Sequence, residues 1–226
     1  AMVEHGTIYL SIPVRLGNQA TVERYFYNAY SRVEEDKERH SFCVTTNLRV
    51  LIENGWTEDL CYLCEPTEYH IKRVTVKFTL DQGVMREFTR HRVFSFAQES
   101  TRYCNYSKDK FGNEITFVFP IWMDEELLNS YGSYHTVARS NTPESIFIAG
   151  LNNAEKDYLS LINMGWKAQE ARAILPNSLK TELVMTGFES DWKHFFELRC
   201  PGSAHPQARE LAIPLQEKFK ELKWVD

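Results

Sequence analysis

Apolar and polar side chains alternate most regularly over residues 74–80, which read Val-Thr-Val-Lys-Phe-Thr-Leu. A period of two over this many residues is typical of a half-buried β-strand. Residues 81–83 then predict a turn, and residues 84–89 predict a short helix. Residues 114–119 (Glu-Ile-Thr-Phe-Val-Phe) predict a second strand, which Pro120 ends. The alternating pattern therefore indicates few strands.

Elsewhere in the first half, apolar residues recur at helical spacing. Val22, Phe26 and Val33 indicate an amphipathic helix over residues 19–40, with the charged run 34–39 as its solvated end. A shorter helix over about residues 45–53 should end at Asn54-Gly55, because this pair is a signal for a left-handed cap.

The pattern predicts that the C-terminal part is helical. Thr142 before Pro143 supplies a cap residue and a proline at the first helical position, and the helix should continue to Gly165. Ser190 is expected to be the N-cap of the helix 191–199. The other predicted helices are 167–175, which Pro176 stops, and 207–222, in which Pro214 can produce a kink.

Together these elements predict an α+β fold in a single domain over residues 1–226, with a mixed or antiparallel sheet flanked by several helices. Neither a Pro/Gly/Ser-rich linker nor an internal repeat divides the chain, and its length is enough to bury a core. Because strands are few, we expect other subunits to cover much of the apolar surface of the helices, so that the chain forms an oligomer. Ala1, before Met2, is expected to be a cloning remnant.

Charge and cysteine usage exclude several classes of protein. Lys and Arg number 26 against 31 Asp and Glu, and the formal charge of −5 argues against a general nucleic-acid binder. Neither a targeting segment nor a membrane-spanning stretch is expected. Five cysteines without a disulfide rhythm indicate reduced thiols and a cytoplasmic location. Cys61 and Cys64 have zinc-ligand spacing, but no second pair accompanies them, so we expect no metal.

Positive charge is concentrated in residues 90–107. Arg90, His91, Arg92 and Arg102 lie close together here, among hydroxyl and amide donors at Ser95, Gln98, Ser100 and Thr101. Arginine makes forked, permanently charged contacts with phosphate oxygens, so this segment favours a phosphorylated small ligand. A basic surface loop, or arginines paired with Glu87 and Glu99, would produce the same composition, and composition alone does not decide between these interpretations.

The spacing within this segment is more specific. Arg90-His91-Arg92, then seven residues, then Ser100 and Arg102-Tyr103, resembles the signature of the flavin-dependent thymidylate synthases. Three further blocks resemble the same family: 171–176 with an Arg before Leu-Pro, 192–199 ending in Leu-Arg, and 204–207 with Ala-His. The resemblance covers roughly residues 45–215.

The resemblance implies an enzyme that converts dUMP to dTMP by reductive methylation. Methylenetetrahydrofolate would be the carbon donor, FAD the hydride carrier and NADPH the reductant. It also implies a homotetramer whose active sites are built between subunits, on a fold with a sheet flanked by helices.

The resemblance also implies roles for individual residues. The expected flavin-binding residues are Thr67, Arg90, His91, Arg92, Gln98, Phe188, Ser190 and His194. The expected dUMP-binding residues are Glu87, Arg90, Gln98, Glu99, Ser100, Arg102, Arg172 and Arg199. Arg199 is the expected catalytic residue, since a fixed guanidinium at a ring carbonyl oxygen would stabilise the uracil anion as carbon 5 becomes nucleophilic.

Several positions depart from the family pattern. Ala97-Gln98 replaces a common Asn-Glu pair, and Glu87 stands where relatives often have Gln. Glu65 and His70 stand where the family has His and Glu. For His70, a purely structural role is at least as good an interpretation. These departures motivate a second hypothesis, a non-catalytic nucleotide- or flavin-binding module with a degenerate site.

Other readings of the same residues stay open. Ser190 as a simple helix cap, His194 as a core-edge donor, and Arg172 and Arg199 as ordinary helix-end cations are each possible. Ser100 has no identifiable His-Asp partner, so a ligand-binding hydroxyl is favoured over a nucleophile. An RNA-binding protein using residues 90–106 fits the basic and aromatic pattern loosely, but not the negative charge.

Overall fold

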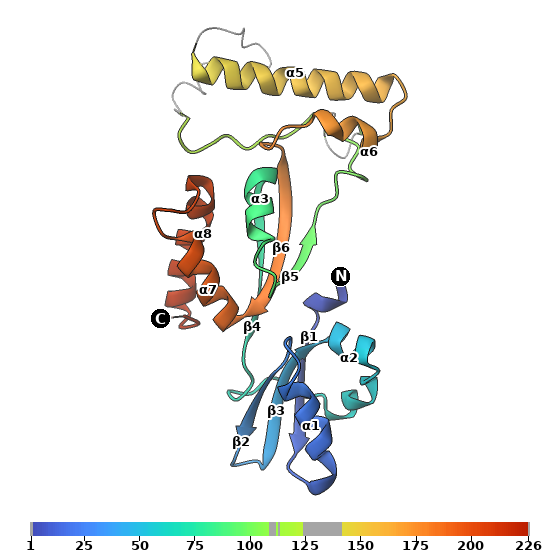
Figure 1. Cartoon of the computed structure of the whole chain (residues 1–226), viewed down its shortest axis with the longest axis vertical. Coiled ribbons are helices and arrows are strands. Elements are labelled where there is room, and N and C mark those ends of the chain that lie inside the picture. The colour runs from blue at the N-terminus through green and yellow to red at the C-terminus, as the bar shows by residue number, and fades with distance from the viewer. Residues whose placement is uncertain (1, 109–111, 113, 124–141, 226) are drawn as a thin grey trace.

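The computed structural model describes residues 2–108, 112, 114–123 and 142–225, so the prediction about Ala1 lies outside the described residues. The α+β expectation is confirmed, but with two three-stranded antiparallel sheets in place of one, in the orders β1-β3-β2 and β4-β6-β5. Figure 1 shows the two sheets in succession along the long axis, with helix α5 lying across the far end of the second. The predicted site residues are therefore distributed over an elongated chain.

Part of the first sheet, β2 and the end of β3, is formed by residues for which helices were expected. The prediction of a helix over 19–40 is wrong beyond residue 26, because Val33 pairs with Val44 in β2, and the start expected for the 45–53 helix belongs to β3. Gly55, with φ of 69°, caps α2 as predicted. The elements are η1 Met2–His5, β1 Thr7–Pro13, η2 Leu16–Asn18, α1 Gln19–Phe26, β2 Arg32–Asp36, β3 Ser41–Asn47, α2 Leu48–Asn54 and η3 Thr57–Tyr62.

The second sheet contains one predicted strand and two, β5 and β6, that were missed. The alternation over 74–80 is confirmed as β4, whereas β6 lies at the centre of the sheet in a part expected to be helical. The 114–119 strand is wrong: Phe117 forms an isolated bridge with Leu179, and the segment joins neither named sheet. The strands are β4 Arg73–Asp81, β5 Ser95–Gln98 and β6 Lys180–Phe188.

Most helices predicted after β4 are present, and Thr142 caps α5 as predicted, but α3 and α7 begin differently. The Asp81 carboxylate accepts from the Val84 N–H at 2.8 Å, so the expected turn is the start of α3. Ser190 is not an N-cap, because α7 begins at Glu189 and the Asp191 carboxylate accepts from the Phe188 N–H. The helices are α3 Gln82–Phe88, α5 Pro143–Asn163 capped by Thr142, α6 Ala168–Ala171 with η6 Arg172–Ile174, α7 Glu189–Arg199 and α8 Pro206–Glu221 with Pro214 inside it.

An aromatic core fixes α3 and α7 against the second sheet. Trp192 is fully buried and donates its indole N–H to the Val74 carbonyl at 3.1 Å. Phe88 and Phe195, from the two helices, meet edge to face at 4.9 Å. A Cβ at Gly187 would lie 2.5 Å from the Phe94 ring, so only glycine lets the ring pack against β6. This core holds the end of α3 beside the end of α7.

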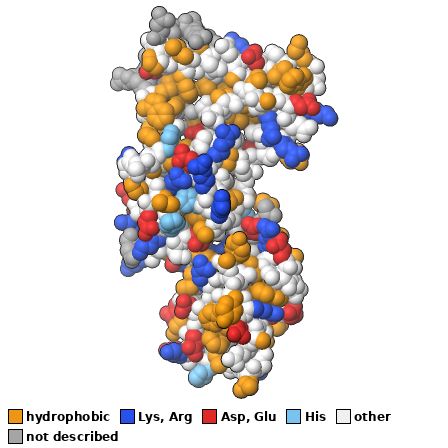
Figure 2. Space-filling view, in the orientation of Figure 1, with side chains coloured by type: hydrophobic (Ala, Val, Ile, Leu, Met, Phe, Trp, Pro, Cys, Tyr) orange, Lys and Arg blue, Asp and Glu red, His pale blue; other side chains and the backbone are white. Residues whose placement is uncertain are grey.

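We call the part built on the first sheet the first region and the part built on the second sheet the second region. Polar and cation–π contacts join the two regions. His5 Nδ1 lies 2.7 Å from Thr186 Oγ1, and Arg73 donates to the Glu4 carbonyl at 3.1 Å. The Arg32 guanidinium lies 4.4 Å from the Phe188 ring centroid. Figure 2 shows Lys and Arg side chains gathered over the middle of one face, beside His and acidic side chains. Positive charge is thus concentrated locally in a chain of negative net charge.

Candidate functional site

The Arg199 guanidinium lies where the end of α7 meets the end of α3. Its Nη1 donates to the Glu87 carboxylate at 2.8 Å, its Nη2 to the Glu87 backbone carbonyl at 2.8 Å, and its Nε to His91 Nε2 at 2.9 Å. Arg199, Glu87 and Arg90 line an open cleft of about 690 Å³. The structure therefore brings together four of the predicted site residues, His91 behind Arg199 and the other three on the cleft.

His91 is buried behind Arg199 and not exposed in the cleft. It is 7% exposed, and its ring lies 5.1 Å from that of Phe195. Burial, with the positive charge of Arg199 and then His194, lowers the pKa of His91 to about 4. His91 is therefore neutral at neutral pH, and its Nε2 is the acceptor for Arg199, which places the ring proton on Nδ1.

A second group of predicted residues follows β5. The Arg172 guanidinium donates to Thr101 Oγ1 at 3.1 Å, and Arg102 lies over Tyr103, 5.5 Å from the ring centroid. The Glu99 carboxylate is 3.7 Å from Lys180 Nζ. Gln98, Glu99, Ser100, Arg102 and Arg172 are all absent from the residues that line the Arg199 cleft.

A third group surrounds Phe188. Arg92 and Phe188 line a cavity of about 150 Å³ together with Arg32, Arg73 and Asp191. Three guanidinium groups thus share a cavity with one carboxylate. Burial lowers the pKa of Arg73 and raises the pKa of Asp191. Cations stacked on an aromatic ring and only partly neutralised favour an anionic group, in particular a phosphate.

The remaining predicted flavin residues lie apart from these groups. Thr67 donates its backbone N–H to His70 Nδ1 at 3.0 Å, and Cys43 Sγ is 3.8 Å from its hydroxyl, so Thr67 packs against the first sheet. His194 is exposed, with Nδ1 3.3 Å from the Glu197 carboxylate, although its ring is 6.3 Å from His91.

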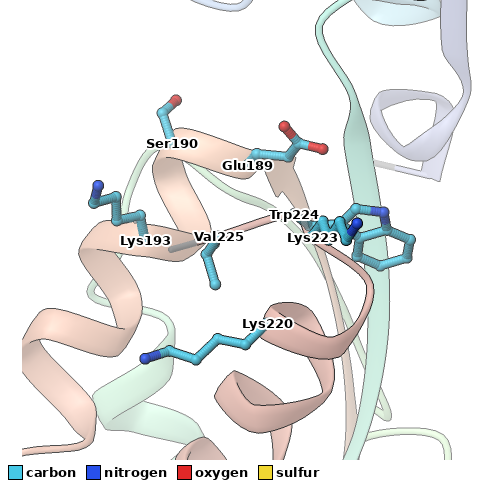
Figure 3. A pocket seen from close by; sticks show the side chains of 7 residues that line it. All are labelled: Glu189, Ser190, Lys193, Lys220, Lys223, Trp224 and Val225. Atoms are coloured by element: carbon cyan, nitrogen blue, oxygen red, sulfur yellow. The ribbon is translucent and has the colours of Figure 1, made fainter.

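Ser190 lines a lysine-rich pocket of about 340 Å³ between α7 and the C-terminal residues. Figure 3 shows Lys193 and Lys223 on opposite sides of this pocket, with Val225 between them. The ammonium groups do not converge, and the pocket gives Ser190 no cluster of donors to act with.

Several site residues were missed by sequence reasoning. Arg86, Ser203 and His205 line the Arg199 cleft, and Arg32 and Arg73 line the Phe188 cavity. His205 was within a block that carried the family resemblance, which was a usable signal. No such signal pointed to Arg32, because its segment was interpreted as part of a helix.

Among residues 2–108, 112, 114–123 and 142–225, no group of three His, Cys, Asp or Glu side chains has metal-holding geometry. Within the same ranges, every helix is too short or too polar to cross a bilayer.

Comparison with known proteins gives a family match and several partial relatives. A family model described as thymidylate synthase complementing protein matches residues 66–223. The flavin-dependent thymidylate synthase of Geobacter sulfurreducens is 26% identical over 141 residues, which are 62% of this chain and 53% of that protein. The Corynebacterium diphtheriae enzyme of the same name is 31% identical over 143 residues, 63% of this chain and 54% of that protein. The chain thus spans about half the length of the curated relatives it matches.

A solved structure is also similar. It is the flavin-dependent thymidylate synthase of Helicobacter pylori complexed with FAD and dUMP, at 20% identity and a TM-score of 0.48, covering 66% of this chain and 70% of that one.

Proposed function

The chain belongs to the thymidylate synthase complementing protein family, whose model matches residues 66–223, and from this premise we propose that it is a flavin-dependent thymidylate synthase. In the proposed reaction, carbon 5 of dUMP gains a methylene group from methylenetetrahydrofolate and loses its proton, and a hydride from reduced FAD completes the methyl group of dTMP. Tetrahydrofolate is released, and NADPH returns the two electrons to FAD. We propose a cytoplasmic location, in keeping with five free cysteines among the described residues.

The observation that carries this proposal is the arrangement of Arg199 in the cleft. Carbon 5 of uracil becomes nucleophilic only when negative charge develops on the ring. A guanidinium that stays protonated and is already oriented stabilises that charge without reorganising during the reaction. The three hydrogen bonds that fix Arg199 supply this orientation.

The Phe188 cavity contains residues that fit FAD. The flavin nucleotide carries a diphosphate, and the donor set of Arg92 with Arg32 and Arg73 has an excess of positive charge over Asp191. When bound, FAD supplies the hydride. Arg92 would bind the diphosphate in this arrangement, whereas Arg90 lines the Arg199 cleft. Roles for Thr67, Gln98, Ser190 and His194 at the flavin stay predictions.

For dUMP, the proposal divides binding between two groups of residues. Arg199 and Glu87 would contact the uracil and sugar, and Arg90 would contribute from the same cleft. The phosphate and sugar would be bound by residues at the end of β5 together with Arg172 of η6, namely Gln98, Glu99, Ser100, Arg102 and Arg172.

Because these groups lie apart in one chain, we propose a homotetramer in which neighbouring subunits complete each active site. Val93, Tyr103 and Leu198 support this, since each is an apolar or aromatic side chain at least half exposed and lies next to a motif residue. At the α5 end, Ile121, Trp122 and Ile146 are 49%, 59% and 45% exposed. Native mass spectrometry should show four copies, and a monomer at working concentration would contradict the shared-site arrangement.

The function is tested by loading the purified chain with FAD. The expected protein is yellow, oxidises NADPH when dUMP and methylenetetrahydrofolate are both present, and forms one dTMP for each NADPH. A chain that does not take up FAD and forms no dTMP under these conditions would refute the proposal.

A non-catalytic nucleotide- or flavin-binding module is the second candidate. The observation that favours it is the ion pair between Glu87 and Arg199, at 2.8 Å, which reduces the positive charge available to a ligand. Release of the carbon-5 hydrogen of dUMP into water distinguishes the two candidates. A protein that binds dUMP but releases no hydrogen would be this module.

A further inference from the structure

Arg199 is held on two sides by groups of its own chain. Each of its three guanidinium nitrogens donates one hydrogen bond, to His91, to the Glu87 carboxylate or to the Glu87 carbonyl. A guanidinium carries five N–H groups in one plane. Three are used by these bonds, which leaves one N–H on Nη1 and one on Nη2. Because all three nitrogens are held, the plane of these two remaining donors is also fixed.

We propose that Glu87 and neutral His91 are positioning residues that hold the Arg199 guanidinium at the cleft, leaving two of its N–H groups to donate to a ring carbonyl oxygen of the substrate. This inference rests on the proposed function. It assigns to His91 a role different from the flavin contact that the resemblance implies, because Nε2 of His91 is already used as an acceptor for Arg199.

The surroundings of His91 suit such a role. Its ring packs between Phe195, at 5.1 Å, and Phe94, at 6.3 Å, so it is fixed by the aromatic core that joins α3 to α7. A protonated imidazole would donate from both nitrogens and repel the guanidinium. The groups near His91 are Arg199 and His194 from α7 and, through Arg199, Glu87 from α3. Of these, only Glu87 would favour a charged imidazole.

Glu87 contributes in two separable ways. Its carboxylate and its carbonyl both accept from Arg199, which orients the guanidinium, and its negative charge partly cancels the field of Arg199. The side chains of Arg199 and Glu87 are 16% and 33% exposed, so solvent screens the pair incompletely. Glu87→Gln would retain a side-chain acceptor while removing the opposing charge.

The first experiment compares variants that remove each acceptor with variants that keep it. His91→Leu and Glu87→Leu remove an acceptor, whereas His91→Gln and Glu87→Gln retain one within reach of Arg199. The measurements are the kcat and KM for dUMP from release of the carbon-5 hydrogen, together with bound FAD and thermal unfolding.

The expected result is a loss of about 100-fold in kcat for both Leu variants, with FAD content retained and a smaller change in KM. The kcat of each Gln variant should stay within about tenfold of that of the unsubstituted enzyme, because an acceptor for Arg199 remains. Leu variants with normal kcat would overturn the proposal. Gln variants as impaired as the Leu variants would also overturn it, because the acceptor position would then not be what matters.

The second experiment does not depend on activity, so it tests the proposal even if the Leu variants fail to fold. NMR of the chain with ¹⁵N-labelled histidine reports the tautomer and titration of His91. We expect the proton on Nδ1, and a pKa that rises towards the ordinary value in Arg199→Ala. A protonated Nε2 at neutral pH, or a titration unchanged in Arg199→Ala, would overturn the proposal.

The two experiments separate the possible failures. An active enzyme with a protonated Nε2 would reject the positioning role alone. An inactive chain with the expected NMR result would reject the proposed function, and with it any role for the contact in orienting substrate.

Discussion

Two arginine–carboxylate pairs of this chain have the same chemistry and different surroundings. In the first region, Arg24 pairs with Asp59, whose side chain is 4% exposed and also accepts from the Tyr25 hydroxyl at 2.6 Å. The Arg24 guanidinium lies 4.7 Å from the Trp56 ring centroid. In the second region, Arg199 pairs with Glu87 on the wall of an open cleft. In the first pair the carboxylate is buried beside aromatic residues, and in the second pair both side chains line the cleft.

This difference indicates how a charge pair acquires a binding role. A pair with a buried carboxylate maintains packing, and its loss is costly mainly because a charge is left unpaired. A pair at a cleft keeps its cation fixed and still able to donate to a ligand. We therefore expect substitutions at Asp59 to affect stability, and substitutions at Arg199 to affect the reaction.

The largest expected effect is that of Arg199→Ala on turnover. Removal of the guanidinium should lower kcat for dTMP formation by about 1,000-fold, or about 4 kcal/mol, because charge on the uracil ring is no longer stabilised. Bound FAD and the unfolding temperature should change little. The control is Arg199→Lys, which keeps the charge without the planar fork and should also lose most activity. Full activity in Arg199→Ala would contradict the assigned role.

The matching test in the first region is Asp59→Ala. Arg24 and Tyr25 lose a shared acceptor, so the free energy of unfolding should fall by about 3 kcal/mol in urea titrations, while turnover of the folded enzyme stays near normal. Glu58→Ala is the control. Its carboxylate is 65% exposed and 3.6 Å from Arg24, so a change of about 0.5 kcal/mol or less is expected. Equal effects of the two substitutions would remove the contrast between enclosed and exposed partners.

A third prediction concerns pH. The folded chain lowers the pKa of His91 to about 4 from the ordinary 6.5, so between these values the unfolded chain binds the additional proton. Stability contributed by this site is fully present above pH 6.5 and declines as the pH falls towards 4, by about 3 kcal/mol. Urea midpoints across this range should show the decline in the unsubstituted chain and a flatter profile in His91→Gln. A profile that His91→Gln leaves unchanged would indicate another group.

The smallest expected effect is that of Arg92→Gln on flavin affinity. Loss of one of three guanidinium groups in the Phe188 cavity should weaken FAD binding about tenfold, or about 1.4 kcal/mol, in fluorescence titrations. Lys218→Gln is the matched control, because it removes a cation whose side chain is 62% exposed and paired with Glu221 on α8. If both variants lose affinity equally, the cavity is not the diphosphate site.

The sequence revealed half-buried elements far better than fully buried ones. β4 was predicted because Lys77 and Thr79 face outward between apolar residues. β3 and β6 were missed because β3 has buried residues on both faces and β6 is buried at four successive residues up to Phe188, which leaves little alternation to detect. The spacing of apolar residues was also misleading at Val33. Its helical spacing from Phe26 is accidental, because Val33 lies in β2 and pairs with Val44 of β3.

The site was predictable to the extent that short motifs carried it. Arg90, His91 and Arg199 belong to family-like blocks, and the fold places all three in one cluster around the cleft. Their mutual contacts could not be predicted, because the pairing of Arg199 with Glu87 depends on how the aromatic core sets α7 against α3. Arg32 and Arg73 escaped for a related reason, since tertiary packing alone brings them to Phe188.

Strand β6 has a consequence for the size of the ligands that this chain can bridge. Glu99 hydrogen-bonds to the backbone of Glu182 at one end of the strand, and Phe188 lies at the other. At about 3.3 Å per residue, the six steps along the strand from Glu182 to Phe188 span about 20 Å. That length exceeds a mononucleotide, so the groups at the two ends of β6 contact different ends of an extended dinucleotide or different molecules. Under the proposed function, the length of one central strand would therefore limit which ligands a single chain can bind on its own.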